Sequence, residues 1–69
     1  MRDLNQDEKD NLEMLIDKTS LQSVLVALSE ICSEKAYHLE TNWDDRRAAR
    51  EWRKLESAIS VTVPKAVNV

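Results

Sequence analysis

The sequence predicts an all-α fold: an antiparallel helical hairpin with a short N-terminal helix and an extended C-terminal tail. Apolar residues recur at steps of three and four through residues 20–41 and again through residues 44–58. This spacing returns side chains to one face of an α-helix. The 69 residues include no glycine, which disfavours the tight turns of β-hairpins because these need positive φ angles. A chain of this length is expected to form one small domain over residues 1–69.

The first helix is expected over residues 5–17. Asn5 is a suitable N-cap, and Glu8 stands three residues later, where its side chain can complete a capping box. Acidic residues crowd the first turns and complement the helix dipole. The apolar residues of this segment form only a modest patch, made of Leu4, Leu12, Leu15 and Ile16. A helix of about 13 residues is marginal in isolation, so we expect it to dock on the rest of the chain.

The longest predicted helix spans residues 20–41 and organises the chain. Thr19 or Ser20 provides its N-cap. Its apolar positions, with one just beyond its end, are Leu21, Val24, Leu25, Leu28, Ile31, Cys32, Ala36, Leu39 and Trp43. This stripe must be covered by other helices or by a second copy of the chain, and Cys32 on the apolar side is expected to be buried.

A third helix is predicted over residues 44–58, after a short break at residues 41–45. Asn42 is expected to take the left-handed conformation that ends the long helix, and Thr41 or Asn42 to cap the next one. The apolar stripe of the third helix is Ala48, Trp52, Leu55 and Ile59. So short a connection favours an antiparallel pair of helices.

The C-terminal tail, residues 60–69, has a different pattern. Val61 and Val63 alternate with Ser60 and Thr62 as in a strand, and Pro64 stops the alternation. Because a lone strand has no partner in a helical chain, we expect an extended or disordered terminus. A segment that packs across a neighbouring subunit is the alternative.

The composition excludes several classes of protein. Without glycine there is no P-loop and no dinucleotide-binding turn. One cysteine excludes an intrachain disulfide, and one histidine leaves a zinc site without enough His and Cys ligands, so neither a metal nor another cofactor is expected. No segment has the roughly 18 consecutive apolar residues of a membrane span, and the acidic N-terminus does not resemble a signal peptide. These observations predict a cytoplasmic protein that is not bound to a membrane.

Oligomerisation is the expected source of additional stability. A domain of this size buries only about 60% of the surface of its unfolded chain, and the usual supplements are disulfides, metals or partner subunits. We expect at least a dimer, assembled through the hairpin. The predicted interface residues are Leu21, Val24, Leu25, Leu28, Ile31, Leu39 and Trp52.

A small anionic ligand is a second predicted partner. Lys35, His38 and Asn42 share one edge of the long helix at steps of three and four. The candidate ligand-binding residues are Lys35, His38, Asn42, Trp43, Arg46 and Arg50. The competing interpretation is that the polar residues only border the apolar face, and that both tryptophans anchor the core of a chain lacking phenylalanine.

The sequence contains no complete set of catalytic residues. Cys32 and His38 are separated by about 9 Å of rise along one helix and point in different directions, so they cannot form a nucleophile–base pair. The chain is therefore not expected to be an enzyme.

The run DDRRAAREWRK invites a helix-turn-helix interpretation, with residues 44–55 as the recognition helix. Acidic residues interrupt the arginines, and the net charge of the chain is −3. Because nucleic-acid binding depends on neutralising phosphates, this pattern argues against a DNA-binding protein.

One stretch resembles a known group of proteins. The residues that carry the resemblance include Leu21, Leu28, Ile31, Cys32, Ala36, His38, Leu39, Asn42, Trp43, Asp45, Ala49 and Trp52. This pattern is similar to that of small helical proteins of bacteria and their phages, for which no activity is assigned. It covers roughly the middle 40 residues, and no site residue can be transferred from it.

The sequence thus favours a non-enzymatic helical interaction protein, a bacterial or phage accessory regulator or inhibitor that acts as a homo-oligomer. The alternative is a protein that binds or sequesters a nucleotide-like anion. A DNA-binding protein is the least favoured of the three.

Overall fold

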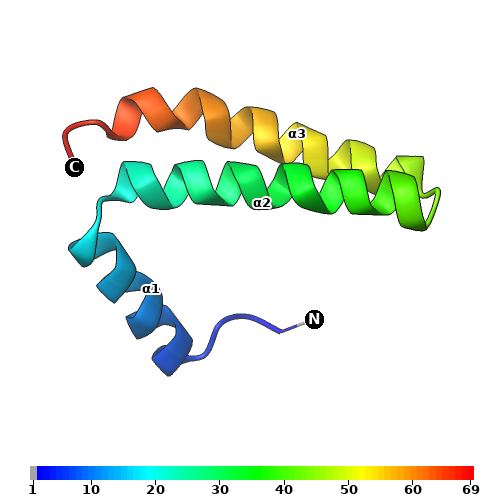
Figure 1. Cartoon of the computed structure of the whole chain (residues 1–69). Helices are drawn as coiled ribbons and strands as arrows, with labels where there is room; N and C mark the ends of the chain where they lie inside the picture. Colours follow the sequence, from blue (N-terminus) through cyan, green and yellow to red (C-terminus); the bar gives the residue numbers. More distant parts are fainter. Residues whose placement is uncertain (1) are drawn as a thin grey trace.

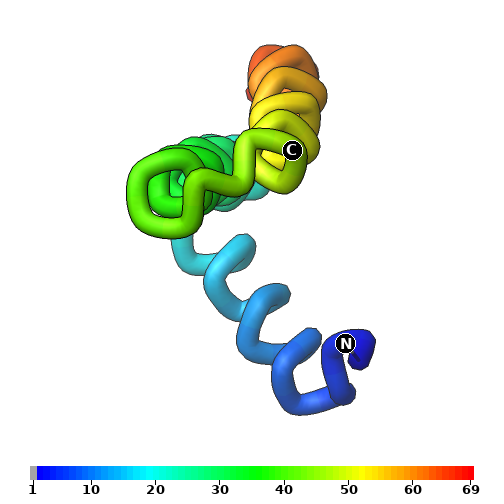
Figure 2. Tube along the Cα trace, turned by 90° about the vertical axis from the view of Figure 1, so that its right-hand side faces the viewer, coloured from blue at the N-terminus to red at the C-terminus, as the bar shows by residue number. Residues whose placement is uncertain are grey.

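The computed structural model describes residues 2–69, and every regular element in this range is helical. The elements are α1 (Gln6–Lys18), α2 (Leu21–Asn42), α3 (Arg46–Thr62) and a short 3-10 helix, η1 (Val63–Ala66). Helices α2 and α3 lie side by side and antiparallel (Figure 1), whereas α1 leaves the start of α2 on the side away from α3 (Figure 2). The predicted all-α fold and helical hairpin are confirmed.

Local hydrogen bonds fix the start of the first two helices where the sequence predicts them. The side-chain oxygen of Asn5 accepts a hydrogen bond from the backbone N–H of Glu8 at 2.8 Å. The carboxylate of Glu8 accepts one from the backbone N–H of Asn5 at 2.9 Å, which completes the capping box. The hydroxyl of Ser20 accepts from the N–H of Ser23 at 3.0 Å and caps α2.

The turn between α2 and α3 differs from the prediction. Asn42 remains helical, and Asp44 takes the positive φ angle instead, at 49°. Asp45 is the N-cap of α3, and its side chain accepts from the N–H of Ala48 at 3.0 Å. The side chain of Asn42 lies 2.7 Å from a ring nitrogen of His38 one turn earlier, a contact made with Asn42 in the helix. Aspartate tolerates the left-handed region nearly as well as asparagine, so sequence alone did not separate them.

The prediction of an extended tail is wrong for residues 60–66. Residues 60–62 form the last turn of α3, and η1 continues directly from it. Pro64 lies in the first turn of η1, where a missing N–H costs no hydrogen bond. Gln22 donates a hydrogen bond to the backbone oxygen of Val63 at 3.2 Å, and Ala66 is buried. The tail therefore packs against the start of α2 instead of extending into solvent.

Side chains at steps of three and four along both helices form the contact between α2 and α3, which we call the hairpin seam. Its α2 residues are Gln22, Leu25, Ser29, Cys32, Ala36 and Leu39, and its other residues are Ala49, Trp52, Glu56, Ile59, Val63 and Ala66; all are buried or half-buried. This is the heptad spacing of coiled-coil helices. The most buried members are small, which lets the two helices approach closely, and Cys32 is buried as predicted.

The seam is displaced from the predicted apolar stripes. In α3, Leu55 was expected to face the core but is 52% exposed, while the neighbouring Glu56 lies in the seam. In α2, Ser29 lies in the seam, while Leu28 and Ile31 are exposed. The long helix is therefore covered by α3 on only part of its apolar surface.

Helix α1 is held weakly. Among the described residues it contacts only α2, it has no buried residue, and its Met14 and Leu15 are exposed, as is Leu4 just before it. The radius of gyration is 13.8 Å. A compact domain of this length would have about 11 Å. The single chain is thus an open arrangement of helices.

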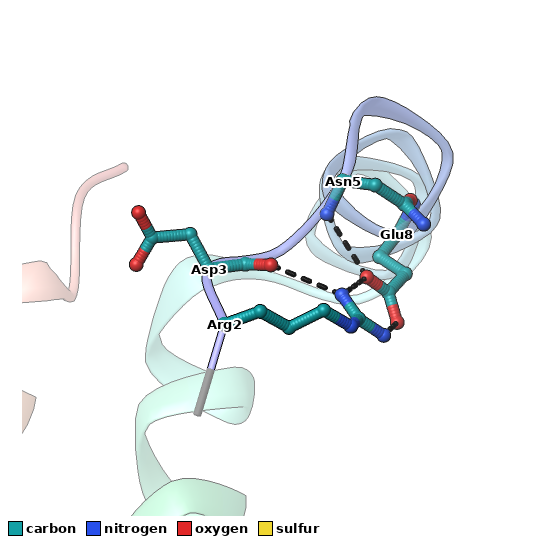
Figure 3. A network of polar contacts seen from close by, with 4 residues as sticks. All are labelled: Arg2, Asp3, Asn5 and Glu8. Carbon is teal, nitrogen blue, oxygen red and sulfur yellow. Dashed lines mark hydrogen bonds and ion pairs between the residues drawn. The ribbon is translucent and has the colours of Figure 1, made fainter.

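An ion pair reinforces the cap of α1. The guanidinium of Arg2 donates two hydrogen bonds to the carboxylate of Glu8, one of them 2.8 Å long (Figure 3). This pair, together with the hydrogen bond from the Asn5 backbone, lowers the pKa of Glu8 from 4.5 to about 2. Glu8 must therefore stay ionised at pH values well below those at which a glutamate side chain usually becomes protonated.

We expect the stabilisation from Glu8 to be complete at neutral pH and lost during acidification. Because the folded pKa lies below the unfolded value, this stabilisation is present above pH 4.5 and disappears as the pH falls toward about 2. Carboxyl chemical shifts of Glu8 in an NMR titration measure this directly. In Arg2→Ala, the Glu8 midpoint is expected to rise; an unchanged midpoint would mean that Arg2 does not hold this carboxylate in solution.

Candidate functional site

Two surfaces, one on each side of the hairpin seam, are candidates for binding a ligand or another protein. The first, the apolar flank, follows α2 at Leu21, Val24, Leu28 and Ile31. The second, the arginine groove, is a depression of about 550 Å³ lined by Glu40, Thr41, Arg46, Arg50 and Arg53. A helix turns by about 100° per residue, which places positions 28 and 31 on one side of the seam residue Ala36 and position 40 on the other.

The apolar flank continues a second heptad along α2, one residue out of step with the seam. Leu28 is 39% exposed and Ile31 is 46% exposed, while Leu21 and Val24 are half-buried. Of the predicted interface residues, Leu25, Leu39 and Trp52 instead lie in the hairpin seam of the same chain. The four residues of the apolar flank remain as candidates for contact with another molecule.

Lys35 and His38 extend the line of the apolar flank toward the turn. They line a smaller depression together with Ile31 and Glu34. The indole N–H of Trp43 donates to Nε2 of His38 at 3.2 Å. On the other side of the ring, the side-chain amide nitrogen Nδ2 of Asn42 lies 2.7 Å from Nδ1 of His38. Trp43 is 70% exposed, so the expectation that both tryptophans are core anchors is wrong for Trp43.

The arginine groove lies between the end of α2 and the first half of α3. Glu40 and Thr41 come from α2, and the three arginines come from α3 at steps of four and three. Nε of Arg53 donates to the carboxylate of Glu40 at 2.9 Å. This bond lowers the pKa of Glu40 and raises that of Arg53. Arg50 has no hydrogen bond or ion pair with the residues that the structure describes.

The structure divides the six predicted ligand-binding residues between these places. Lys35, His38, Asn42 and Trp43 stand together on one side, and Arg46 and Arg50 line the groove on the other. The groove adds Glu40, Thr41 and Arg53, which were not among the predicted ligand-binding residues. The steps 46, 50 and 53 were visible in the sequence as one face of a helix, but Glu40 joins them only through the register of the hairpin.

Other kinds of site find no support in the described part of the chain. Residues 2–69 hold no cluster of three or more His, Cys, Asp or Glu side chains suited to a metal ion. No helix in this range is both long enough and apolar enough to cross a membrane. Comparisons with protein-family models, curated proteins and solved structures gave no match. The function is therefore inferred from the surfaces of the chain itself.

Proposed function

We propose that this chain is a non-enzymatic interaction protein that acts as a homodimer, with the apolar flank of α2 as the contact between two copies. It would serve as a small regulator or inhibitor, which fits the predicted accessory role in bacteria or phages. The observation that carries the proposal is that α2 has two adjacent heptad seams, and that the second is left exposed within the chain at Leu28 and Ile31.

The arrangement of α2 supports a second helical partner. The filled seam runs through Leu25 and Cys32. The second seam runs from the half-buried Val24 to the exposed Leu28 and Ile31. A helix with two neighbouring apolar seams is typical of bundles of three or four helices, where each helix packs against two others. Two hairpins joined along their α2 helices would form such a four-helix bundle.

The exposed area supports the same conclusion. The accessible surface of the chain is 5757 Å². A compact monomer of this mass would expose about 4,450 Å², so the excess is roughly 1,300 Å². A stable interface buries about 800 Å² on each partner. The excess is therefore large enough for a dimer contact.

A two-fold axis fits the pattern of the flank. In an antiparallel pair of α2 helices, Leu28 would lie beside its own counterpart at the axis. Val24 would then face Ile31 of the second copy, because both lie within four residues of Leu28. The apolar part of the flank is thus complementary to itself.

Leu28→Asp is expected to abolish the dimer and leave the hairpin folded. Leu28 lies outside the hairpin seam, but two carboxylates would meet at the axis of the dimer, at a cost of several kcal/mol. We expect the dissociation constant to rise at least 100-fold. Analytical ultracentrifugation measures the mass, and circular dichroism measures the helix content.

Val26→Asp is the matched control. Val26 is 38% exposed, almost as much as Leu28, but lies on the other side of the seam from the apolar flank. This variant is expected to keep the dimer mass of about 16 kDa, twice the 8.0 kDa of one chain. An 8.0 kDa wild-type monomer at tens of micromolar would disprove the homodimer. Equal loss of the dimer in both variants would show that another surface forms it.

A further inference from the structure

We propose that the arginine groove is a binding site for a small anion with several linked phosphoryl groups, held by Arg46, Arg50 and Arg53. The three arginines lie on one face of α3 and line the same depression. Their Cα atoms span about 10 Å along the helix axis, which matches an extended chain of phosphoryl groups better than a single phosphate.

Most hydrogen-bond donors of these arginines are free. Arg50 has no partner among the described residues, and Arg46 has only a loose 3.7 Å contact with Asp44, in which both side chains are exposed. Arg53 uses Nε to hold Glu40, and its two terminal nitrogens have no hydrogen bond in residues 2–69. Planar guanidinium groups of this kind bind phosphate oxygens through two parallel hydrogen bonds.

The arginines of the groove repeat along one face of α3 with no acidic residue between them on that face. The N-cap Asp45 complements the positive end of the helix dipole, and its carboxylate is engaged with the N–H of Ala48 at 3.0 Å. Glu51 pairs with Lys54 at 3.3 Å and does not line the groove. A bound polyphosphate would offset the repulsion between the guanidinium groups of Arg46 and Arg50.

Glu40 positions Arg53 instead of closing the groove to anions. It is the one carboxylate among the lining residues, and its charge is matched by the 2.9 Å bond to Arg53. Thr41 donates its hydroxyl proton to the backbone oxygen of Tyr37 at 2.8 Å, so it has no proton to offer a ligand. The arginines therefore supply the donors, which selects for a ligand with acceptor oxygens only.

This site is independent of the proposed dimer. The arginine groove and the apolar flank lie on opposite sides of the hairpin seam, so each can be disrupted without the other. Leu28→Asp should bind the anion as the wild type does.

Isothermal titration calorimetry of the full chain with pyrophosphate and with ATP, at 150 mM salt, tests the proposal. We expect saturable binding of one anion per chain. Arg50→Gln should weaken binding at least tenfold and leave the fold unchanged, because Arg50 has no partner among residues 2–69. Lys65→Gln removes the same charge from η1, at the other end of the hairpin, and should change the affinity less than twofold.

The outcomes separate the possible ligands. Tighter binding of ATP than of pyrophosphate would identify a nucleotide, and equal binding would show that the phosphoryl groups alone are recognised. No saturable heat with either anion would overturn the proposal. So would equal weakening by Arg50→Gln and Lys65→Gln, since that result reflects net charge and not a site. Binding of duplex DNA without binding of pyrophosphate would point to a nucleic-acid surface and would also overturn it.

Discussion

Ala36→Leu is expected to destabilise the hairpin strongly. Ala36 is 0% exposed and Ala49 is 1% exposed. The hydrogen bond from Gln22 to Val63 joins the start of α2 to the end of the antiparallel α3. Counting fourteen residues from this bond along each helix leads to Ala36 and Ala49, the two most buried residues of the hairpin seam. Three additional carbon atoms at this point have no space and must force the helices apart.

The expected loss of stability is a large part of the total stability of so small a domain. Overpacking a filled core costs about 1–3 kcal/mol, occasionally more. A domain of this size rarely has more than about 3–5 kcal/mol of stability in total. We therefore expect the midpoint of thermal unfolding to fall by about 10 °C or more, measured by circular dichroism.

Ala27→Leu provides the control for Ala36→Leu. Ala27 is an exposed residue of the same helix, and leucine has a similar helix propensity at both positions. Its melting temperature is expected to change little. An unchanged melting temperature in Ala36→Leu would mean that α2 and α3 do not approach each other as closely as the structure has them.

Glu56→Leu is expected to stabilise the protein. Glu56 occupies a seam position, and its Oε2 atom is buried without a hydrogen-bond partner among the described residues. The register places it level with Ser29, whose hydroxyl donates to the backbone oxygen of Val26. Leucine would remove the unpartnered oxygen and add apolar contact with Ile59 and Leu25, so the cost of burying a polar atom disappears.

We expect a gain of about 1–2 kcal/mol in the free energy of unfolding, or roughly 4–15 °C in melting temperature. Glu51→Leu serves as the comparison, because Glu51 is exposed and pairs only with Lys54 at the surface. A lower melting temperature for Glu56→Leu would show that the carboxylate has a partner in solution. The polar seam would then act to hold the helices in register.

Local signals in the sequence determined the helices and most of their ends. The capping box at Asn5, the cap at Ser20 and the burial of Cys32 all agree with the structure. These features depend on residues within one or two turns of each other, so they can be predicted without knowledge of the fold. The groove arginines at positions 46, 50 and 53 share a face for the same local reason.

Tertiary contacts decided what the local signals left open. Asp44 and Asn42 are both suited to a positive φ angle, and the contact of Asn42 with His38 accompanies its helical conformation. The alternating valines of the tail predict a strand. In the structure residues 60–66 are helical, and η1 contacts both α2 and α3. No pattern within residues 60–66 indicates that the start of α2 lies beside them.

Only the tertiary structure determines which face of each helix lies in the hairpin seam. The sequence of α2 supports two heptads one residue apart, one through Leu28 and one through Ser29, and the first is the more apolar. The structure fills the second, because Cys32, Ala36 and Ala49 are small enough for close packing around Trp52. The sequence by itself determined that α2 has more apolar surface than one neighbour can cover. Only the packing of α3 decided that Leu28 and Ile31 would be the residues left for another partner.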